Sequence, residues 1–362
     1  MKNTYGNHIA ITLFGESHGP SVGVVIDGLT PGLPVDEAVI ADFLSRRRPQ
    51  GDISTARQEA DAFVIESGVF HGRTTGTPIC IRIPNTDARS EDYTDIERLA
   101  RPGHADVAAH YKYHGFEDYR GGGHFGGRIT AVLVAAAGIV MPALEKKGIR
   151  IGTHISRLGG VDDRAFADLS ADMDVLNTNF PVLDASAKDT MIERILAAKA
   201  DGDSIGGVLE TAVVGMPAGV GEPWFDTMEG LLSHALFSIP AVKGVEFGDG
   251  FAMADMCGSE ANDTWYMQSV PMTATNHNGG INGGITNGMP LVFRCAIKPT
   301  PTIAKEQRTV SLAESEDAVL AARGRHDPCI VHRAAVVVDA VTALVMCDVL
   351  TGRFGTDWLG EA

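Results

Sequence analysis

The chain has 362 residues, of which 44% are hydrophobic and 21% are charged, and its formal net charge at pH 7 is −16. This composition is that of a globular protein, and the acidic balance disfavours non-specific binding to nucleic acid or to an anionic membrane. Any anionic ligand must therefore be bound by a local concentration of basic side chains. Such concentrations occur at Arg46 to Arg48, at Arg101 with His104, at Arg120 to Arg128, and at Arg323 with Arg325.

The cysteines and the apolar segments indicate a cellular location. Five cysteines are spread along the chain without a CxxC pair, which is typical of reduced thiols. The N-terminal residues lack the apolar core and the cleavage site of a signal peptide. The longest apolar run, from Ala131 to Leu144, is interrupted by Gly138 and Pro142 and is too short to cross a bilayer. We therefore expect a cytoplasmic protein that does not enter the membrane.

Apolar periodicity and turn residues predict a chain of alternating strands and helices. The expected elements, in chain order, are strands at 9–14 and 21–27, a helix between Asp36 and Pro49, strands at 62–69 and 78–83, a helix from Asp106 to about Tyr113, and a buried helix from Ile129. The residue Asp36 is suited to cap a helix N-terminus, and Pro49 is suited to end the same helix.

Two short patterns of the first half recur in the same order in the second half. Ser21–Asp27 resembles Ser204–Glu210, and Gly76–Arg82 resembles Gly288–Arg294. Short matches of this kind also arise by chance in a β-rich chain. Their preserved order favours an internal duplication. The predicted organisation is one domain over residues 1–362, with pseudo-repeated halves at roughly 8–150 and 190–350.

A glycine-rich stretch, DYRGGGHFGGR from Asp118 to Arg128, precedes the buried helix. Glycine weakens helices and strands, so this concentration indicates either a flexible surface turn or a backbone that must lie close against a ligand. A loop that leads into a helix N-terminus offers free N–H groups and a positive dipole end, which suit an anion such as phosphate. The stretch lacks GxGxxG and Walker spacing, so it does not indicate a dinucleotide site or a P-loop.

Several histidines could carry chemistry. His18 lies in the turn FGESHG, where an imidazole could protonate a leaving phosphate or could only hold the turn together by hydrogen bonds. His104 precedes a helix in RPGHAD, and Asp106 could orient its ring or cap the helix. His110 and His114 are four residues apart and could bind a metal, but no third ligand has a telling spacing, so no metal is expected.

Three further motifs offer charged or polar groups. Arg46–Arg48 could bind a phosphate or a carboxylate, and would in either case stabilise a helix C-terminus. Lys298–Thr302, KPTPT, follows a predicted strand and offers an ammonium, two hydroxyls and a rigid backbone suited to phosphate or a polar ring edge. Gly324–Pro328, GRHDP, has the form of a turn whose Arg and Asp would suit a charged ligand.

A set of motifs between Phe14 and Cys329 resembles chorismate synthase, in the order found in that family. The motifs are FGESHG, RPGHAD, DYRGGG followed by Gly-Arg, DGDSIGG, GxGEPxFD, AVKGVEFGDGF, NHxGGIxGGI, IKPTPT and GRHDPC. The resemblance implies an α+β fold, a layered β-α sandwich, and a homotetramer. It also implies a lyase of the shikimate pathway of aromatic amino acid biosynthesis. Such a lyase eliminates phosphate and a ring proton from 5-enolpyruvylshikimate 3-phosphate to give chorismate, and it requires reduced FMN.

The same resemblance implies roles for individual residues. His18 would protonate the departing phosphate, His104 would keep the reduced flavin correctly protonated, and Asp327 would work with flavin N5 in removing the ring proton. The residues implied to hold the anionic groups of the substrate are Arg47, Arg48 and Arg128. The residues implied to bind FMN are His124, Phe125, Gly126, Gly283, Lys298, Pro299, Thr300, Pro301, Thr302 and Arg325.

Because the chain is acidic, we expect the cations and imidazoles of this set to converge in one cleft. The sequence departs from the resemblance at Gly126, where Ser is usual, and at Pro240, where Asn is common. The resemblance thus implies that a side-chain hydroxyl contact to FMN is lost at Gly126, where only a backbone contact could persist, and that another FMN contact is affected at Pro240. Gln50–Ile53 lacks a basic residue common there, which weakens the case for NADPH as the reductant. Two other functions fit parts of the pattern: a metal-dependent phosphatase that uses His110 and His114, and a non-catalytic protein that binds phosphometabolites.

Overall fold

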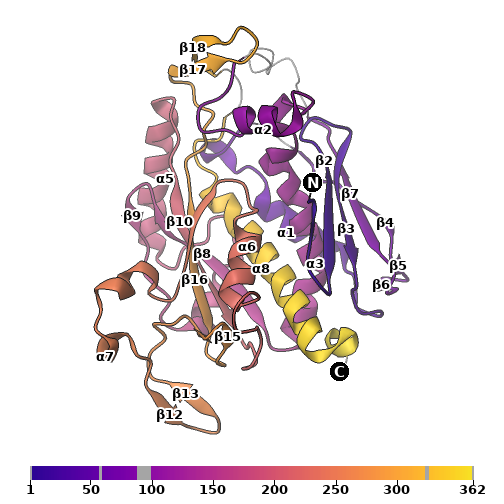
Figure 1. Cartoon of the computed structure of the whole chain (residues 1–362), viewed down its shortest axis with the longest axis vertical. Helices are drawn as coiled ribbons and strands as arrows, with labels where there is room; N and C mark the ends of the chain where they lie inside the picture. Colours follow the sequence, from indigo (N-terminus) through magenta and orange to yellow (C-terminus); the bar gives the residue numbers. More distant parts are fainter. Residues whose placement is uncertain (1, 57–58, 88–98, 323–325, 361–362) are drawn as a thin grey trace.

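Two antiparallel sheets enclose a layer of helices in the computed structural model, which describes residues 2–56, 59–87, 99–322 and 326–360 (Figure 1). The first five-stranded sheet contains, in spatial order, β1 (Thr4–Tyr5), β2 (Ala10–Gly15), β3 (Ser21–Asp27), β7 (Ile79–Pro84) and β4 (Val64–Ser67). The second five-stranded sheet contains β11 (Val242–Phe247), β16 (Leu291–Ile297), β10 (Gly207–Val214), β8 (Arg150–Leu158) and β9 (Val161–Asp162).

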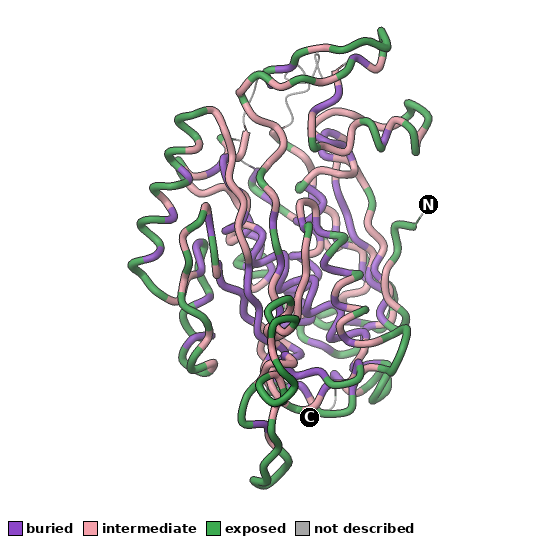
Figure 2. Tube along the Cα trace, turned by 60° about the vertical axis from the view of Figure 1, so that its left-hand side comes forward, coloured by how far each residue is buried: buried purple, intermediate pink, exposed green. Residues whose placement is uncertain are grey.

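The middle layer consists of α1 (Glu37–Arg47), α3 (Thr130–Lys146) and α8 (Val331–Phe354). Helix α3 contacts β3 and β7 of the first sheet and β8 of the second, while α8 contacts β8 and β10. Buried residues therefore concentrate in the interior between the sheets (Figure 2). This arrangement confirms the predicted α+β class and the layered β-α sandwich.

Further helices and hairpins surround this sandwich. The helices are α2 (Asp106–Tyr113), α4 (Leu169–Asp174), α5 (Ala185–Ala200), α6 (Met228–Leu236) and α7 (Gly258–Ala261). The hairpins are β5 (Val69–Phe70) with β6 (Arg73–Thr74), β12 (Trp265–Met267) with β13 (Pro271–Thr273), β14 (Ile281–Asn282) with β15 (Ile285–Thr286), and β17 (Gln307–Ser311) with β18 (Glu316–Leu320).

Local sequence accounts for helix α1 and for its close packing on α3. The Asp36 carboxylate accepts a hydrogen bond from the Ala38 N–H at 2.9 Å, which confirms the predicted cap. A Cβ on Gly138 of α3 would lie 2.9 Å from the Ile40 Cα, so glycine permits the close crossing of the two helices. The predicted buried helix from Ile129 is confirmed, and α3 continues through both Gly138 and Pro142.

Two helices are long and apolar enough to cross a membrane by length and composition. They span Gly127–Lys146 and Val331–Phe354, and the first extends beyond the apolar run Ala131–Leu144 at both ends. Within each, 89% of the most hydrophobic window is buried inside the protein, which identifies both as core helices. Helix α8 was absent from the sequence-based expectations.

The segments matched in the predicted duplication occupy similar places in the two sheets. Strand β3 pairs with β7 in one sheet, and β10 pairs with β16 in the other, both antiparallel. The registers differ: Arg82 lies opposite Gly23, whereas Arg294 lies opposite Glu210 rather than Gly206. The internal duplication and its two halves stay a prediction.

A buried carboxyl on α8 makes stability depend on pH. Asp339 accepts a hydrogen bond from Thr153 Oγ1 at 2.6 Å. Burial raises the pKa of Asp339 from 3.8 to about 7, although the bond from Thr153 and the charge of Arg46 act in the opposite direction. Between these two pH values the unfolded chain releases the proton while the folded chain retains it. The stability contribution of Asp339 therefore falls as pH rises through this window and is constant above it.

We expect Asp339→Asn to abolish the fall in the free energy of unfolding that Asp339 causes as pH rises. The free energy of unfolding of the variant, relative to the wild type, should increase by about 2–4 kcal/mol from pH 4 to pH 8. Urea unfolding at both pH values measures the difference. The exposed Asp189 provides a matched control, since Asp189→Asn should show no such change. A pH-independent difference for the Asp339 variant would contradict the expectation.

Candidate active site

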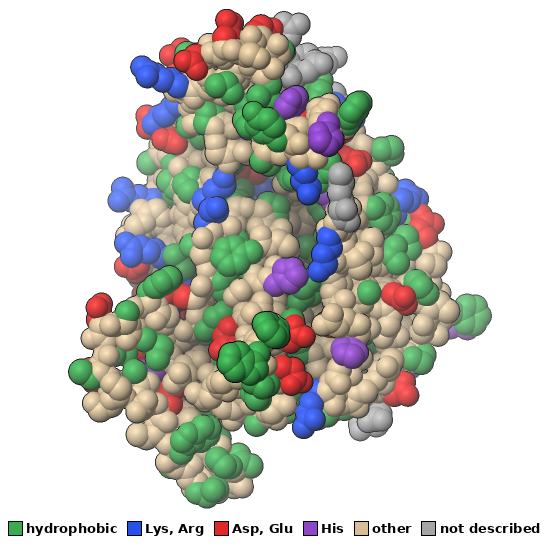
Figure 3. All heavy atoms as spheres, viewed as in Figure 1, with side chains coloured by type: hydrophobic (Ala, Val, Ile, Leu, Met, Phe, Trp, Pro, Cys, Tyr) green, Lys and Arg blue, Asp and Glu red, His purple; other side chains and the backbone are tan. Residues whose placement is uncertain are grey.

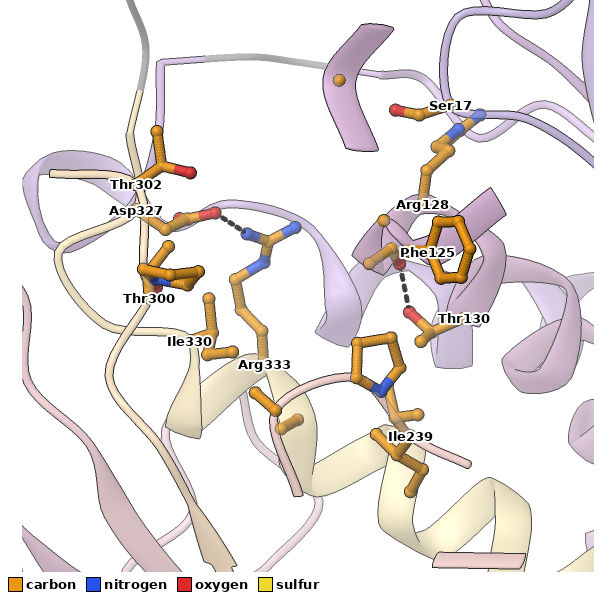
Figure 4. A pocket seen from close by; sticks show the side chains of 18 of the residues that line it. Ser17, Phe125, Arg128, Thr130, Ile239, Thr300, Thr302, Asp327, Ile330 and Arg333 are labelled. Atoms are coloured by element: carbon orange, nitrogen blue, oxygen red, sulfur yellow. Dashed lines mark hydrogen bonds and ion pairs between the residues drawn. The ribbon is translucent and has the colours of Figure 1, made fainter. Parts of the chain in front are cut away.

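A cavity of about 590 Å³ lies beside the last residue of α1 and the first turns of α3 and α8 (Figure 4). This volume is within the range of about 300–1,000 Å³ found for small-molecule sites. Its lining comes from Ser17 and from segments within 47–61, 101–105, 121–130, 237–242, 298–302 and 326–337. The described lining includes five cations, Arg47, Arg101, Arg128, Lys298 and Arg333, and three carboxylates, Glu59, Asp61 and Asp327. The cavity is therefore electropositive in an acidic chain.

Most of the predicted site residues meet in this cavity. The predicted residues that line it are Arg47, His104, His124, Phe125, Gly126, Arg128, Lys298, Thr300, Pro301, Thr302 and Asp327. Pro240 also lines it. Arg325 lies outside the described residues. The described residues predicted for the site but absent from its lining are His18, Arg48, Gly283 and Pro299.

These four residues lie in different places. His18 packs directly behind Gly121, which lines the cavity. Arg48 is near the wall, since its Nε is 3.8 Å from Asp61 Oδ2. Pro299 lines a neighbouring hollow, which shares Gly103, Lys298, Thr300 and Pro301 with the cavity. Gly283 lies at the turn of the β14–β15 hairpin and does not contribute to the cavity of this chain.

His104 is held in one orientation by a carboxylate and a guanidinium. Its Nδ1 lies 2.6 Å from Asp106 Oδ1, and Asp106 also accepts two hydrogen bonds from the Arg101 side chain. Because a carboxylate oxygen accepts hydrogen bonds, this short distance assigns a proton to Nδ1. The other ring nitrogen, Nε2, lies beside Gly122. Burial alone would raise the pKa of Asp106, but the bonds from Arg101 and His104 hold it well below its usual range. Of the two roles predicted for Asp106, the structure shows contact with the ring, while the N-cap position of α2 is Ala105.

Two members of the glycine triplet lie close to imidazole rings. Gly121, Gly122 and Gly123 have φ values of 60°, 90° and 53°, in the left-handed region. A Cβ on Gly121 would lie 2.2 Å from the His18 ring, and one on Gly122 would lie 3.2 Å from His104 Nε2. Gly122 and Gly123 are buried, so this part of the loop is not an exposed turn. The backbone of the loop is bent to fit against both rings.

Asp61 joins two arginines on one wall of the cavity. Its side chain is fully buried, its φ is 52°, and it lies 3.1 Å from Arg47 NH2 and in direct contact with Arg128 NH1. Burial would raise the pKa of Asp61, but Arg47 and Arg128 hold it below its usual range. Burial also lowers the pKa of Arg47 to about 10, against the attraction of Asp61. One carboxylate therefore compensates two buried cations only partly, and the wall stays positive.

Asp327 lies on the opposite side of the cavity with both oxygens held. Its Oδ1 accepts from the Thr55 N–H at 2.8 Å, and its Oδ2 accepts from Arg333 NH1 at 2.8 Å (Figure 4). Below it, Thr300 Oγ1 is buried without a hydrogen-bond partner among the described residues. An unpaired buried hydroxyl is costly, so Thr300 is suited to bind a ligand.

The His110–His114 pair has no metal-binding geometry. Helix α2 ends at Tyr113, and His114 is its C-cap in a left-handed conformation with φ of 59°. His110 Nδ1 is 3.7 Å from Glu117 Oε1. Over the described ranges no group of three or more His, Cys, Asp or Glu residues is arranged to hold a metal ion.

Sequence reasoning missed Asp61, Thr55 and Arg333. Asp61 and Thr55 belong to no recognisable motif, because they follow α1 in irregular chain whose course depends on tertiary contacts. Arg333 had a usable signal: a basic residue six positions after Asp327, at the start of a long apolar segment.

Comparisons with known proteins agree with this structure. A family model described as chorismate synthase matches residues 9–351. The chorismate synthase of Pyrococcus abyssi is 46% identical over 350 residues, which cover 96% of this chain and 97% of that protein. The chorismate synthase of Chitinophaga pinensis is 44% identical over 346 residues, covering 96% of each. A crystal structure of a chorismate synthase matches with a TM-score of 0.76 and 28% identity, covering 98% of this chain and 95% of that chain.

The two-sheet sandwich and its cation-lined cavity are thus those of an enzyme of the lyase class. The match of fold and sequence extends over nearly the whole chain. The chain belongs to the chorismate synthase family.

Proposed function

We propose that this chain makes chorismate in the shikimate pathway, by 1,4-elimination of phosphate from 5-enolpyruvylshikimate 3-phosphate with reduced FMN bound in the cavity. The observation that carries the proposal is the convergence of imidazoles, arginines and Asp327 on one electropositive cavity from segments far apart in sequence. A phosphorylated substrate with further carboxylates needs such a field inside an acidic protein.

The cavity has features that fit FMN. Gly126 and Gly127 line it, and a Cβ built on Gly127 would meet no atom within 4 Å, so the backbone there is open to a flat ligand. Thr300 Oγ1 lacks a protein partner among the described residues. The residues proposed to hold FMN are His124, Phe125, Gly126, Lys298, Thr300, Pro301 and Thr302, with Arg325. When bound, reduced flavin supplies a transient electron that promotes loss of an allylic phosphate and is returned afterwards.

The side chains around the cavity would act on the substrate itself. His18 is the proposed acid for the departing phosphate, and its ring packs against Gly121, which lines the cavity. Asp327 is the proposed acceptor of the ring proton, together with the flavin. His104, oriented by Asp106, would keep the flavin in its correct protonation state. The residues proposed to bind substrate anions are Arg47, Arg48 and Arg128.

An anaerobic assay tests the proposal directly. Purified protein, dithionite-reduced FMN and 5-enolpyruvylshikimate 3-phosphate should release phosphate and form chorismate, while oxidised FMN should support neither. Phosphate release that is independent of flavin and falls with a chelator would instead indicate a metal-dependent phosphatase. Binding of the substrate without turnover would indicate a non-catalytic protein. Addition of NADPH in place of dithionite would show whether the chain reduces its own flavin.

We also propose a homotetramer in the cytoplasm. The arm that carries β12 and β13 extends from the sandwich and exposes apolar side chains (Figure 3). Its exposed large residues are Trp265, Tyr266, Met267 and Val270. Exposed clusters of this kind mark protein interaction sites. All five cysteines are free, which suits a reducing compartment. Analytical ultracentrifugation measures the oligomeric state.

Gly121→Ala should lower activity because the new methyl group cannot share space with His18. The added Cβ would lie 2.2 Å from the ring, so the ring or the loop must move, and we expect kcat to fall at least about tenfold. Gly148→Ala is a matched control, since Gly148 has a φ of 78° and no atom within 4 Å of its built Cβ. Equal activity in the two variants would contradict a catalytic position for His18.

A further inference from the structure

Arg333 occupies an unfavourable place for a structural cation. It is in the first turn of α8, where the helix dipole is positive and a basic side chain is not stabilised. It also lies near other cations, because its charge contributes to lowering the pKa of Arg47 and of the buried His332. In both residues burial is the larger cause. Asp327 compensates this charge within the protein, and a bound anion would add to that compensation.

Two of the three guanidinium nitrogens of Arg333 are engaged by the protein. Nε donates to the Arg47 carbonyl oxygen at 2.8 Å, and NH1 donates to Asp327 Oδ2 at 2.8 Å. These contacts connect the end of α1 with the proposed base. They fix the guanidinium plane, because a planar group held at two nitrogens has little freedom left.

The third nitrogen, NH2, has no hydrogen-bond partner within the described part of the chain. In Figure 4 it points across the cavity toward the wall of Phe125 and Arg128. Arg128 differs in this respect, since its Nε, NH1 and NH2 donate to Asn85, Asp61 and Pro84. Arg333 therefore has an amino group directed into the cavity and available to an anion.

We propose that Arg333 is both a positioning residue and a binding residue: one amino group holds Asp327, and the other binds an anionic oxygen of the phosphorylated substrate. The inference rests on the function proposed above and assigns a role to a residue outside the motifs that indicated it. A bound anion would compensate the charge at the α8 N-terminus. It would also place the substrate next to the carboxylate that is proposed to take its proton.

Substrate affinity, measured without turnover, tests the binding role. In calorimetric titrations of protein loaded with oxidised FMN, Arg333→Met should weaken binding of 5-enolpyruvylshikimate 3-phosphate by about 10- to 100-fold. Arg333→Lys should restore part of this affinity through its charge. Parallel titrations with shikimate and with inorganic phosphate show which group of the substrate is bound. If Arg333 binds the carboxylate, Arg333→Met should lose affinity for shikimate; if it binds the phosphate, the variant should lose affinity for inorganic phosphate.

The positioning role predicts a split between binding and turnover. In Arg333→Lys, kcat at saturating substrate should stay below the wild-type value even where binding is partly restored. One ammonium cannot hold Asp327 and the substrate in the geometry that a guanidinium provides. Arg150→Met is the control: Arg150 forms an exposed ion pair with Asp174, and its loss should leave Kd and kcat unchanged. Thermal unfolding of each variant checks that it is folded.

The outcomes separate the two proposals. A wild-type protein that neither binds the substrate nor releases phosphate would refute the proposed function itself. A fully active wild type with unchanged substrate affinity in Arg333→Met would overturn only the role of Arg333. A folded Arg333→Lys variant that recovers no affinity for the substrate would also overturn this role, because the positive charge at position 333 would then not be responsible for binding the anion.

Discussion

His104→Ala is expected to lower kcat for phosphate release by about 10²- to 10⁴-fold, the range typical of a lost acid–base group. The ring is positioned by Asp106 at 2.6 Å and lines the cavity, so its removal leaves no other described imidazole in the same place. His18→Ala should cause a loss of similar size if His18 protonates the leaving phosphate. Stopped-flow measurement of phosphate release under anaerobic conditions, with reduced FMN, gives kcat for each variant.

The matched control for His104 is His110 on the adjacent helix. Its side chain is 43% exposed and lies outside the cavity, so His110→Ala should retain wild-type kcat. Full phosphate release in both His18→Ala and His104→Ala would refute the catalytic assignment. A large loss in His110→Ala that zinc restores would favour the metal-dependent alternative.

Asp61→Ala is expected to lower the free energy of unfolding by about 3–5 kcal/mol, because it leaves two buried arginines without their carboxylate. Arg47 and Arg128 both contact Asp61, whose side chain is fully buried. The pKa of Asp61 is held below its usual value in the folded protein. The ionised carboxylate therefore contributes fully to the free energy of unfolding above the unfolded-state pKa, and this contribution is lost as pH falls through the folded-state pKa.

Urea unfolding at pH 7 measures this effect. Asp174→Ala is the matched control, since Asp174 forms an exposed ion pair with Arg150, and its loss should cost less than about 1 kcal/mol. A change for Asp61→Ala as small as that of the control would contradict a structural role for the buried cluster. High phosphate should reduce the loss if the freed arginines bind the anion instead.

Several elements could be predicted because their signals are local. The cap of α1 at Asp36, the strands β2 and β3, and the helix α2 all follow from neighbouring residues. Cap chemistry and alternating apolar residues act within a few positions, so they can be recognised without knowing the fold. Most residues assigned to the site came from ordered motifs and line one cavity; the described exceptions are His18, Arg48, Gly283 and Pro299.

Other features depend on contacts between distant segments. Gly138 weakens a helix on local grounds, yet α3 continues through it because α1 packs against that position. The sequence indicates a reason for the glycine triplet only in general terms, whereas the fold shows that two of its members lie close to the His18 and His104 rings. Asp61 and Arg333 acquire their roles only from the partners that folding brings to them. The reason is physical: hydrogen bonds and charge compensation are short-ranged in space and independent of separation along the chain.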